Sequence, residues 1–374
     1  MGLESLAAFE SALKETAESV QRFFLNHQMT LATSEDLKQS LVYYPSLGGK
    51  RLRPFLVIAS CGAVGGEPDK ALPLAAAVEL YHTSTLVLDD IIDRDEKRRG
   101  GDSVHIKWSK VATERYGWGK GFADHYGLSV AILTGELQRS FSIGGLLPLL
   151  YYEKGVRCEV VLKLIRELDF MTSQMLASGE LEDVIFSRTP VRELGEDKII
   201  HMLWEKTGSL YRFCGLSGAM VGLDTDDENE PLVSKMANFA GQCGLAFQIQ
   251  DDILGIIGKE DQIGRSAGSD ITSGKRSLVL WWALKNASSN ERMKIEKILG
   301  NPTRSPSDAE TAIDILKDSG AINFAAETAR AYVLGGEVNG KKITGALEYL
   351  DGIDNGKYLQ LLKGWAQYLV NRQL

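Results

Sequence analysis

The sequence contains none of the features that direct a chain into or across a membrane. Its longest uncharged apolar stretches, such as residues 141–152, fall well short of the about 18 residues that a membrane-spanning helix needs. The first residues, MGLESLAAFE, carry neither the basic segment nor the apolar segment of a signal peptide. We therefore expect no transmembrane segment and a cytoplasmic location.

Positive charge and cysteine are both in short supply. The 374 residues include 42 lysines and arginines against 50 aspartates and glutamates, which gives a formal net charge of −8. An acidic chain without a basic run is a poor candidate for non-specific nucleic-acid binding, so we expect no nucleic-acid partner. The cysteines stand far apart without C-x-x-C spacing, which favours buried free thiols over disulfides or zinc. They are Cys61, Cys158, Cys214 and Cys243.

Alternating strand patterns are also missing, and apolar residues recur at three- and four-residue steps along most of the chain. Residues 73–93 and 236–257 are hydrophobic nearly all round, as expected for helices inside a large core. Asn339 and Gly340 form an Asn-Gly pair, but it lies in a polar stretch that we expect to be a loop. Because no long linker divides the chain, we predict one all-α domain of many helices over residues 1–374.

Two pairs of adjacent aspartates end two of these apolar helices. Asp89 and Asp90 are followed one turn later by Asp93, and Asp251 and Asp252 form the second pair. On a helix, Asp89 and Asp93 share a face, where a hard cation such as Mg²⁺ removes the cost of placing like charges together. One such cluster alone is more often a solvated helix end. The second pair favours two helices that present metal-binding carboxylates across a shared cavity.

Cations gather near expected helix ends. The segment GGKRLRP, residues 48–54, places three cations in a glycine-flanked turn before a helix, where backbone and helix N-terminus favour an anion. Each cation alone would be an ordinary surface charge. Together with the acidic pairs, they indicate a site for two polyphosphates, one of them bridged by metal. The cations outside this segment are Arg98, Arg99, Lys206, Arg265, Lys275 and Arg276.

In order and spacing, these motifs resemble the trans-isoprenyl (polyprenyl) diphosphate synthases, and in particular those of the geranylgeranyl diphosphate synthase type. The matching segments are GGKRLRP, DDIID followed by RRG, KTG, FQ-x-x-DD and GK, within residues 48–284. The resemblance implies an all-α fold, a single large multi-helix bundle around a central substrate cavity. It also implies a transferase that joins isopentenyl diphosphate head to tail to an allylic diphosphate and releases diphosphate. Its allylic partner would be dimethylallyl, geranyl or farnesyl diphosphate. Relatives are usually homodimers, so the resemblance also implies a homodimer.

The resemblance implies a metal role for each aspartate. Asp89 and Asp93 would ligate two of three Mg²⁺ ions, with Asp90 in support and Mn²⁺ as a substitute metal. Asp251 would hold the third ion, backed by Asp252.

It also assigns the cations and the polar side chains. The allylic diphosphate would be contacted by Arg98, Lys206, Arg265 and Lys275. Isopentenyl diphosphate would be held by Lys50, Arg53, His82 and Arg99. Thr207 and Gln248 would face the developing carbocation with oxygen lone pairs, and the released diphosphate would accept the proton, so His82 is interpreted as a phosphate donor and not a general base.

Two positions depart from the family pattern. Many relatives carry Asp where this chain has Gly255, a position on the same helix face as Asp251, so affinity for the third ion is expected to be weaker. Arg265 stands where relatives usually place Lys; it keeps the charge and can grip phosphate through two nitrogens.

Product length is predicted from the side chains that precede Asp89. Ser84 and Thr85 are small, and Tyr81 is the next large side chain toward the helix N-terminus. Relatives that stop at farnesyl place bulky aromatic side chains where this chain has Ser84 and Thr85, so the resemblance implies a geranylgeranyl product, with geranylfarnesyl or a longer chain as the alternative. Tyr81 packed merely against a neighbouring helix is an equally good interpretation.

Two rival functions remain. A terpene cyclase or head-to-head synthase would not need Lys50, Arg53 and Arg99 to hold isopentenyl diphosphate. A non-catalytic subunit of a heteromeric synthase would typically have lost aspartates, whereas this chain keeps five of six.

Overall fold

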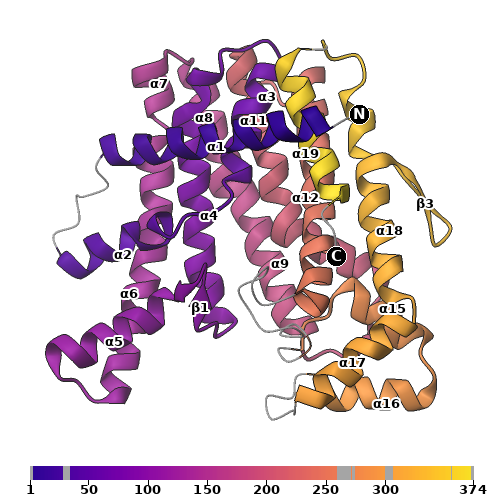
Figure 1. Cartoon of the computed structure of the whole chain (residues 1–374). Helices are drawn as coiled ribbons and strands as arrows, with labels where there is room; N and C mark the ends of the chain where they lie inside the picture. The colour runs from indigo at the N-terminus through magenta and orange to yellow at the C-terminus, as the bar shows by residue number, and fades with distance from the viewer. Residues whose placement is uncertain are drawn as a thin grey trace. The chain divides into compact units, whose positions relative to one another are not determined.

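Figure 1 shows the computed structural model of the chain, in which helices dominate. The structure describes residues 3–27, 34–258, 271, 274–299, 306–354 and 356–371. Backbone contacts divide the chain into two compact units. The N-terminal unit comprises Ala7–Asp169 and Ser217–Glu228, and the C-terminal unit comprises Met1–Leu6, Phe170–Leu216 and Asn229–Leu374. The single domain over residues 1–374 stays a prediction.

The N-terminal unit contains the elements that carry the first acidic motif and the GGKRLRP segment. They are α1 (Leu3–Asn26, whose first residues belong to the C-terminal unit), α2 (Glu35–Ser46), α3 (Leu52–Ala63), η1 (Pro68–Ala71), α4 (Leu72–Ile92), β1 (Lys97–Arg98), β2 (Gly101–Asp102), α5 (Val104–Tyr116), α6 (Lys120–Ser140), η2 (Phe141–Leu146), α7 (Leu149–Lys154), α8 (Cys158–Ile165) and η3 (Arg166–Thr172, whose last residues belong to the C-terminal unit).

Helix α4 forms the buried centre of this unit. It was predicted over residues 73–93, and every residue from Pro73 to Tyr81 is buried, against α3, α6 and η2 among others. Proline in its first turn suits a helix start, because that position has no intrahelical partner for its nitrogen. By length and composition alone, Pro68–Ile92 is the one stretch of the described residues that could cross a membrane, but 72% of its most apolar window is buried inside the fold.

The C-terminal unit contains the second acidic motif. Its elements are α9 (Ser173–Phe186), η4 (Val191–Glu193), α10 (Glu196–Leu203), η5 (Trp204–Gly208), α11 (Ser209–Leu223, whose last residues belong to the N-terminal unit), α12 (Pro231–Ile257), α15 (Leu278–Asn286), α16 (Ser289–Ile298), α17 (Pro306–Asp318), α18 (Ala321–Leu334), β3 (Gly336–Val338), β4 (Lys341–Ile343), η6 (Ala346–Leu350) and α19 (Lys357–Asn371).

Helix α12 is the centre of the C-terminal unit, against α18, α19, η5 and η6. Its start is fixed by Glu230, whose carboxylate accepts hydrogen bonds from the backbone nitrogens of Leu232 and Val233 at 2.7 and 2.9 Å. The helix therefore begins five residues before the predicted position 236 and ends at Ile257, as predicted.

The interpretation of Asn339 and Gly340 as part of a loop was wrong. They are the two turn residues of an antiparallel hairpin in which Val338 pairs with Lys341 and Gly336 with Ile343. Both turn residues have positive φ (52° and 75°), the conformation that an Asn-Gly pair favours in a two-residue hairpin. The strands escaped detection because they are short and mostly exposed, so they lack an apolar alternation.

The cysteine prediction holds for three residues and fails for one. Cys61, Cys214 and Cys243 are buried thiols, whereas Cys158 is exposed at the first position of α8.

Candidate functional site

The first acidic motif presents two carboxylates on one face of the end of α4. Asp89 is half-buried and Asp93 is exposed, and a carboxylate oxygen of each lies within 4.8 Å of the other. The backbone nitrogen of Asp93 bonds the carbonyl of Asp89 at 2.8 Å, which continues the helical geometry that places the two on one face. The pair therefore suits a shared hard cation, as the sequence predicted.

The second aspartate of the motif points elsewhere. Asp90 has no exposed surface, and its carboxylate accepts hydrogen bonds from the Tyr44 hydroxyl and from Nε of Arg98, the latter at 2.7 Å. Burial raises the pKa of Asp90, and the Arg98 guanidinium opposes that shift. Asp90 therefore occupies the interior of the fold, where it holds Arg98.

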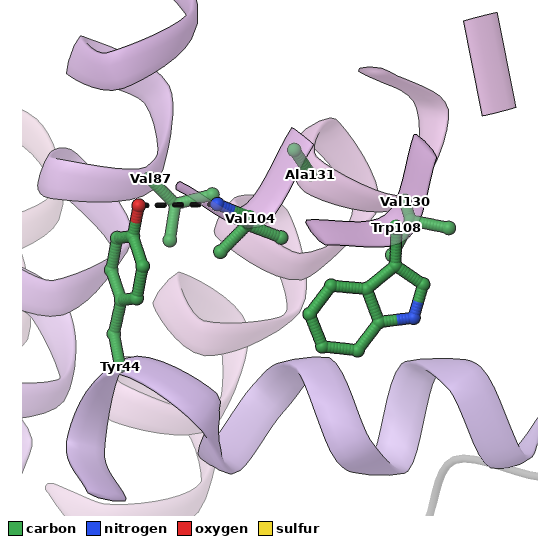
Figure 2. Packing of buried hydrophobic residues seen from close by; sticks show 6 residues of the cluster. All are labelled: Tyr44, Val87, Val104, Trp108, Val130 and Ala131. Carbon is green, nitrogen blue, oxygen red and sulfur yellow. Dashed lines mark hydrogen bonds between the residues drawn. The ribbon is translucent and has the colours of Figure 1, made fainter. Parts of the chain in front are cut away.

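Tyr44, which sequence reasoning missed, links this carboxylate to the hydrophobic core. Burial, followed by the charge of Asp90, raises the pKa of Tyr44 far above its usual range, so the phenol stays protonated and donates. Its oxygen also accepts a hydrogen bond from the backbone nitrogen of Val104 at 3.2 Å, as Figure 2 shows. Tyr44 lies in a buried cluster with Val87, Val104, Trp108, Val130 and Ala131.

A tight hairpin separates Arg98 from Arg99. Arg98 pairs with Gly101 in the two short strands, and Arg99 and Gly100 form the turn with φ of 52° and 79°. Arg98 contacts Asp90 and, at 3.2 Å, Asp89. Arg99 instead donates to the backbone carbonyls of Tyr44, at 3.2 Å, and Gly48. The turn thus sends two consecutive guanidinium groups to different places in the N-terminal unit.

The Arg99 guanidinium lies against the glycines of GGKRLRP. At Gly49, where φ is 138°, an added Cβ would lie 2.9 Å from Cζ of Arg99, so only glycine fits there. Beside this loop is an open hollow of about 470 Å³. Gly48, Gly49 and Arg51 line it together with Ala17, Glu18, Gln21 and Arg22 of α1.

His82 lies beside Arg53 of the GGKRLRP segment. Nη1 of Arg53 lies 3.0 Å from Nε2 of His82. Because arginine only donates, Nε2 accepts and the imidazole proton is on Nδ1. Burial, followed by the charges of Arg53 and Arg99, lowers the pKa of His82 well below its usual value. A neutral imidazole with one nitrogen engaged is a weak base.

Arg51 also lines the hollow, but its guanidinium is engaged inside the fold. Its guanidinium forms a buried ion pair with Glu79 and donates to the carbonyl of Pro45 at 2.8 Å. Glu79 was missed from the sequence, although the signal was present: it is the single charged residue in the apolar stretch 71–81. An ionised group in such a run requires a buried partner.

In the C-terminal unit, Lys206 follows α10 in the π-helical turn η5. Its ammonium group lies 2.6 Å from Asp183 and 3.0 Å from Glu180, both on α9. These two carboxylates were also missed from the sequence, where GELED, residues 179–183, looks like an ordinary polar face of a helix.

Thr207, Gln248, Asp252 and Lys275 are joined in one polar chain. The Thr207 hydroxyl donates to Oε1 of Gln248 at 2.8 Å, and Nε2 of Gln248 donates to Oδ1 of Asp252 at 3.0 Å. Nζ of Lys275 lies 3.6 Å from the same oxygen. The structure thus brings four of the predicted residues together.

The remaining residues of the second motif lie on or beyond α12. Asp251 is half-buried, whereas Asp252 is 1% exposed, so the two again differ in accessibility. Gly255 lies one turn after Asp251 on the same helix. Arg265 lies outside the described residues.

The predicted chain-length residues follow one another along α4. Thr85 is half-buried and lies one turn of helix before Asp89. Tyr81 is 3% exposed and lies two turns before Asp89. The Ser84 hydroxyl is buried and donates to the carbonyl of Tyr81 at 2.7 Å. Asp89 and Thr85 are thus half-buried, whereas Ser84, which is 2% exposed, and Tyr81 are buried.

Known proteins resemble this chain closely. A family model described as polyprenyl synthetase matches residues 34–316. Geranylgeranyl diphosphate synthase of Saccharolobus solfataricus is 31% identical over 297 residues, 79% of this chain and 80% of the relative. Geranylfarnesyl diphosphate synthase of Aeropyrum pernix is 31% identical over 303 residues, 80% and 86% of the two chains. The crystal structure of geranylgeranyl pyrophosphate synthetase from Pyrococcus horikoshii has a TM-score of 0.79 at 29% identity and 99% coverage of both chains. The predicted all-α fold is confirmed.

Proposed function

The chain belongs to the polyprenyl synthetase family, and from that premise we propose that it joins isopentenyl diphosphate head to tail to an allylic diphosphate. The observation that carries this proposal is the separation of cations within the N-terminal unit. Arg98 contacts the aspartates of α4, while Arg99 lies against Gly48 and Gly49 of the GGKRLRP loop. Two groups of cations suit two diphosphates, one beside a metal site and one without metal.

The carboxylates present fit magnesium. Asp89 and Asp93 offer hard oxygen atoms on one accessible face, and Asp251 offers another in the C-terminal unit. We propose that these three residues hold the Mg²⁺ ions, three in number, and that Mn²⁺ can substitute. When bound, the metal stabilises the negative charge of the diphosphate leaving group.

The cations of the GGKRLRP loop and those beside it are proposed to hold isopentenyl diphosphate. Lys50, Arg53 and Arg99 supply charge, and His82 supplies its Nδ1 proton as a neutral donor. The low pKa of His82 and its bond to Arg53 support the interpretation that it is no general base. Removal of the proton from the condensation product is therefore left to the released diphosphate.

The residues of the C-terminal unit are proposed to act on the allylic substrate. Lys206 and Lys275 would bind its diphosphate and favour departure of that group, a role also proposed for Arg98. Thr207 and Gln248 would face the allylic carbocation. Because water would trap that cation, the surrounding side chains must be apolar or already hydrogen-bonded, as Thr207 and Gln248 are.

We propose geranylgeranyl diphosphate as the product. Relatives of similar identity include both geranylgeranyl and geranylfarnesyl diphosphate synthases, so a longer product is the alternative. Buried Tyr81, two turns before Asp89, supports the shorter chain. A cytoplasmic homodimer stays part of the proposal.

The test is turnover by the purified chain alone. Enzyme, Mg²⁺, isopentenyl diphosphate and each allylic diphosphate are incubated in turn, and the dephosphorylated products are sized. A twenty-carbon product is expected. Products of twenty-five or more carbons would establish the longer-chain alternative, and no product from any pair would point to a non-catalytic subunit.

A further inference from the structure

The polar chain from Thr207 to Asp252 has a fixed direction. An ionised carboxylate can only accept hydrogen bonds, so the amide group of Gln248 must turn its nitrogen toward Asp252. The amide oxygen of Gln248 then faces Thr207, and the Thr207 hydroxyl must donate to it. The direction follows from the chemistry of Asp252 and does not depend on how the amide atoms are assigned.

We propose that Asp252 is a positioning residue that, through Gln248, turns the hydroxyl proton of Thr207 away from the allylic carbocation. This inference rests on the proposed function. With its proton committed to Gln248, Thr207 presents only oxygen lone pairs on its remaining side. A lone pair stabilises a developing positive charge, whereas an O–H group pointed at the same place would destabilise it.

Packing between η5 and α12 holds the polar chain in place. Gln248 and Asp252 are one turn apart on α12, and Thr207 is on η5, which packs against that helix. The close approach depends on glycine: an added Cβ at Gly241 would lie 2.4 Å from the Trp204 ring, and one at Gly208 would lie 2.9 Å from it. Trp204 can therefore lie between η5 and α12 while the Thr207 hydroxyl still reaches Gln248.

Burial and charge protect the direction. Thr207 is 6% exposed and Asp252 is 1% exposed, so water has little access to the two ends of the polar chain, while Gln248 between them is half-buried. Lys275 lies 3.6 Å from the Asp252 oxygen that accepts from Gln248, and its positive charge compensates the buried carboxylate.

Two substitutions of Asp252 separate hydrogen bonding from charge. Asp252→Asn removes the charge but keeps an oxygen that Lys275 attracts and that Gln248 can reach. Asp252→Leu removes the acceptor as well, so the Gln248 amide is free to turn over. Both variants are expected to lose activity, and the leucine variant should have a kcat at least tenfold below that of the asparagine variant. The Mg²⁺ concentration for half-maximal rate should be the same in both, and melting temperature and circular dichroism check the fold.

A double substitution shows whether the effect passes through Thr207. In a Thr207→Val background there is no hydroxyl to orient, so adding Asp252→Leu should lower kcat by less than about threefold. The same change in the wild-type background should lower it by at least tenfold. A structural or metal-binding role for Asp252 would give the full loss in both backgrounds.

Either of two results would overturn the inference: equal kcat in the asparagine and leucine variants, or an undiminished effect of Asp252→Leu beside Thr207→Val. Results that contradict the proposed function itself are different from these. They would be no turnover by the unmodified chain, or full activity of Asp251→Asn, and neither result depends on the direction of the polar chain.

Discussion

Arg98 and Arg99 are consecutive in the sequence, yet Arg98 donates to the Asp90 carboxylate and Arg99 to the Gly48 carbonyl. The hairpin turn at Arg99 and Gly100 produces this divergence, because both residues adopt positive φ. Each arginine is therefore built into a different group of charges. If the two groups of charges bind the two diphosphates, a substitution in one group should change the kinetic constants for one substrate more than those for the other.

We expect Lys50→Ala and Arg53→Ala chiefly to raise the KM for isopentenyl diphosphate, by tenfold or more for each lost charge-assisted contact, at about 1.4 kcal/mol per factor of ten. Lys206→Ala should instead impair the allylic substrate and lower kcat, since diphosphate departure depends on it. Steady-state kinetics with each substrate varied in turn makes the measurement, with the exposed Arg192→Ala as control. Equal effects of all three variants on both substrates would refute the assignment.

Stability should also distinguish the consecutive arginines. Arg98→Ala strips the buried Asp90 of its cation, and breaking a buried pair in this way costs about 3–5 kcal/mol of the free energy of unfolding. Arg99→Ala removes hydrogen bonds to backbone carbonyls and a 3.8 Å ion pair with Glu79, which keeps Arg51 as its partner, so it should cost less. Urea unfolding of both variants measures the difference; a smaller loss for Arg98→Ala than for Arg99→Ala would show that Asp90 does not depend on Arg98. Adding Asp90→Asn to Arg98→Ala should recover part of the loss.

Metal dependence is expected to be absolute. Turnover should stop in EDTA and return with Mg²⁺ or Mn²⁺, and Asp89→Ala or Asp251→Ala should lower it by several orders of magnitude, because metal-assisted departure of diphosphate supplies much of the rate acceleration. The exposed Glu114→Ala controls for the loss of a carboxylate. Near wild-type rates in either aspartate variant would be incompatible with the mechanism. Gly255→Asp should improve affinity for Mg²⁺ if the position lacks a supporting ligand.

His82 makes stability depend on pH in a predictable direction. Burial and neighbouring arginines lower its pKa in the folded chain, so below about pH 6.5 the unfolded chain binds a proton that the folded chain does not. The contribution of His82 to the free energy of unfolding is fully present above that pH. It is lost as the pH falls, by up to about 1.4 kcal/mol per pH unit. His82→Gln should lose less stability than the wild type between pH 7 and 5 in urea unfolding. The exposed His125→Gln is the control, and parallel pH curves for wild type and His82→Gln would contradict the prediction.

Sequence reasoning succeeded where a local pattern decides the structure. Helices α4 and α12 follow from long apolar runs, and the shared face of Asp89 and Asp93 follows from helical spacing. It could not foresee the inward direction of Asp90, because that depends on Tyr44, 46 residues earlier in the chain. The partners of Arg51 and Lys206 were missed for the same reason.

Turn chemistry explains the misjudged hairpin. The pair Asn339 and Gly340 carried the right signal, but three-residue polar strands gave no alternation to accompany it. The hairpin is held from outside itself, since Asn339 donates to Glu196 at 2.9 Å and Lys341 lies 2.5 Å from Asp197. A prediction from apolar spacing alone cannot detect a hairpin that is held by polar contacts with residues distant in the sequence.

Product length gives the sharpest test of the site. Tyr81 and Thr85 lie on the face of α4 that leads to Asp89, where Thr85 is half-buried and Tyr81 is buried. A chain that grows from the diphosphate along this face would meet the small Ser84 and Thr85 first and then the Tyr81 ring. Tyr81→Ala should therefore lengthen the product, and Ser84→Phe should shorten it to farnesyl diphosphate, because a phenyl ring would occupy the space one turn earlier. Chromatography of the dephosphorylated products measures both changes, with Tyr81→Phe as the control that keeps the ring. Unchanged products in both Tyr81→Ala and Ser84→Phe would show that another helix supplies the end of the cavity.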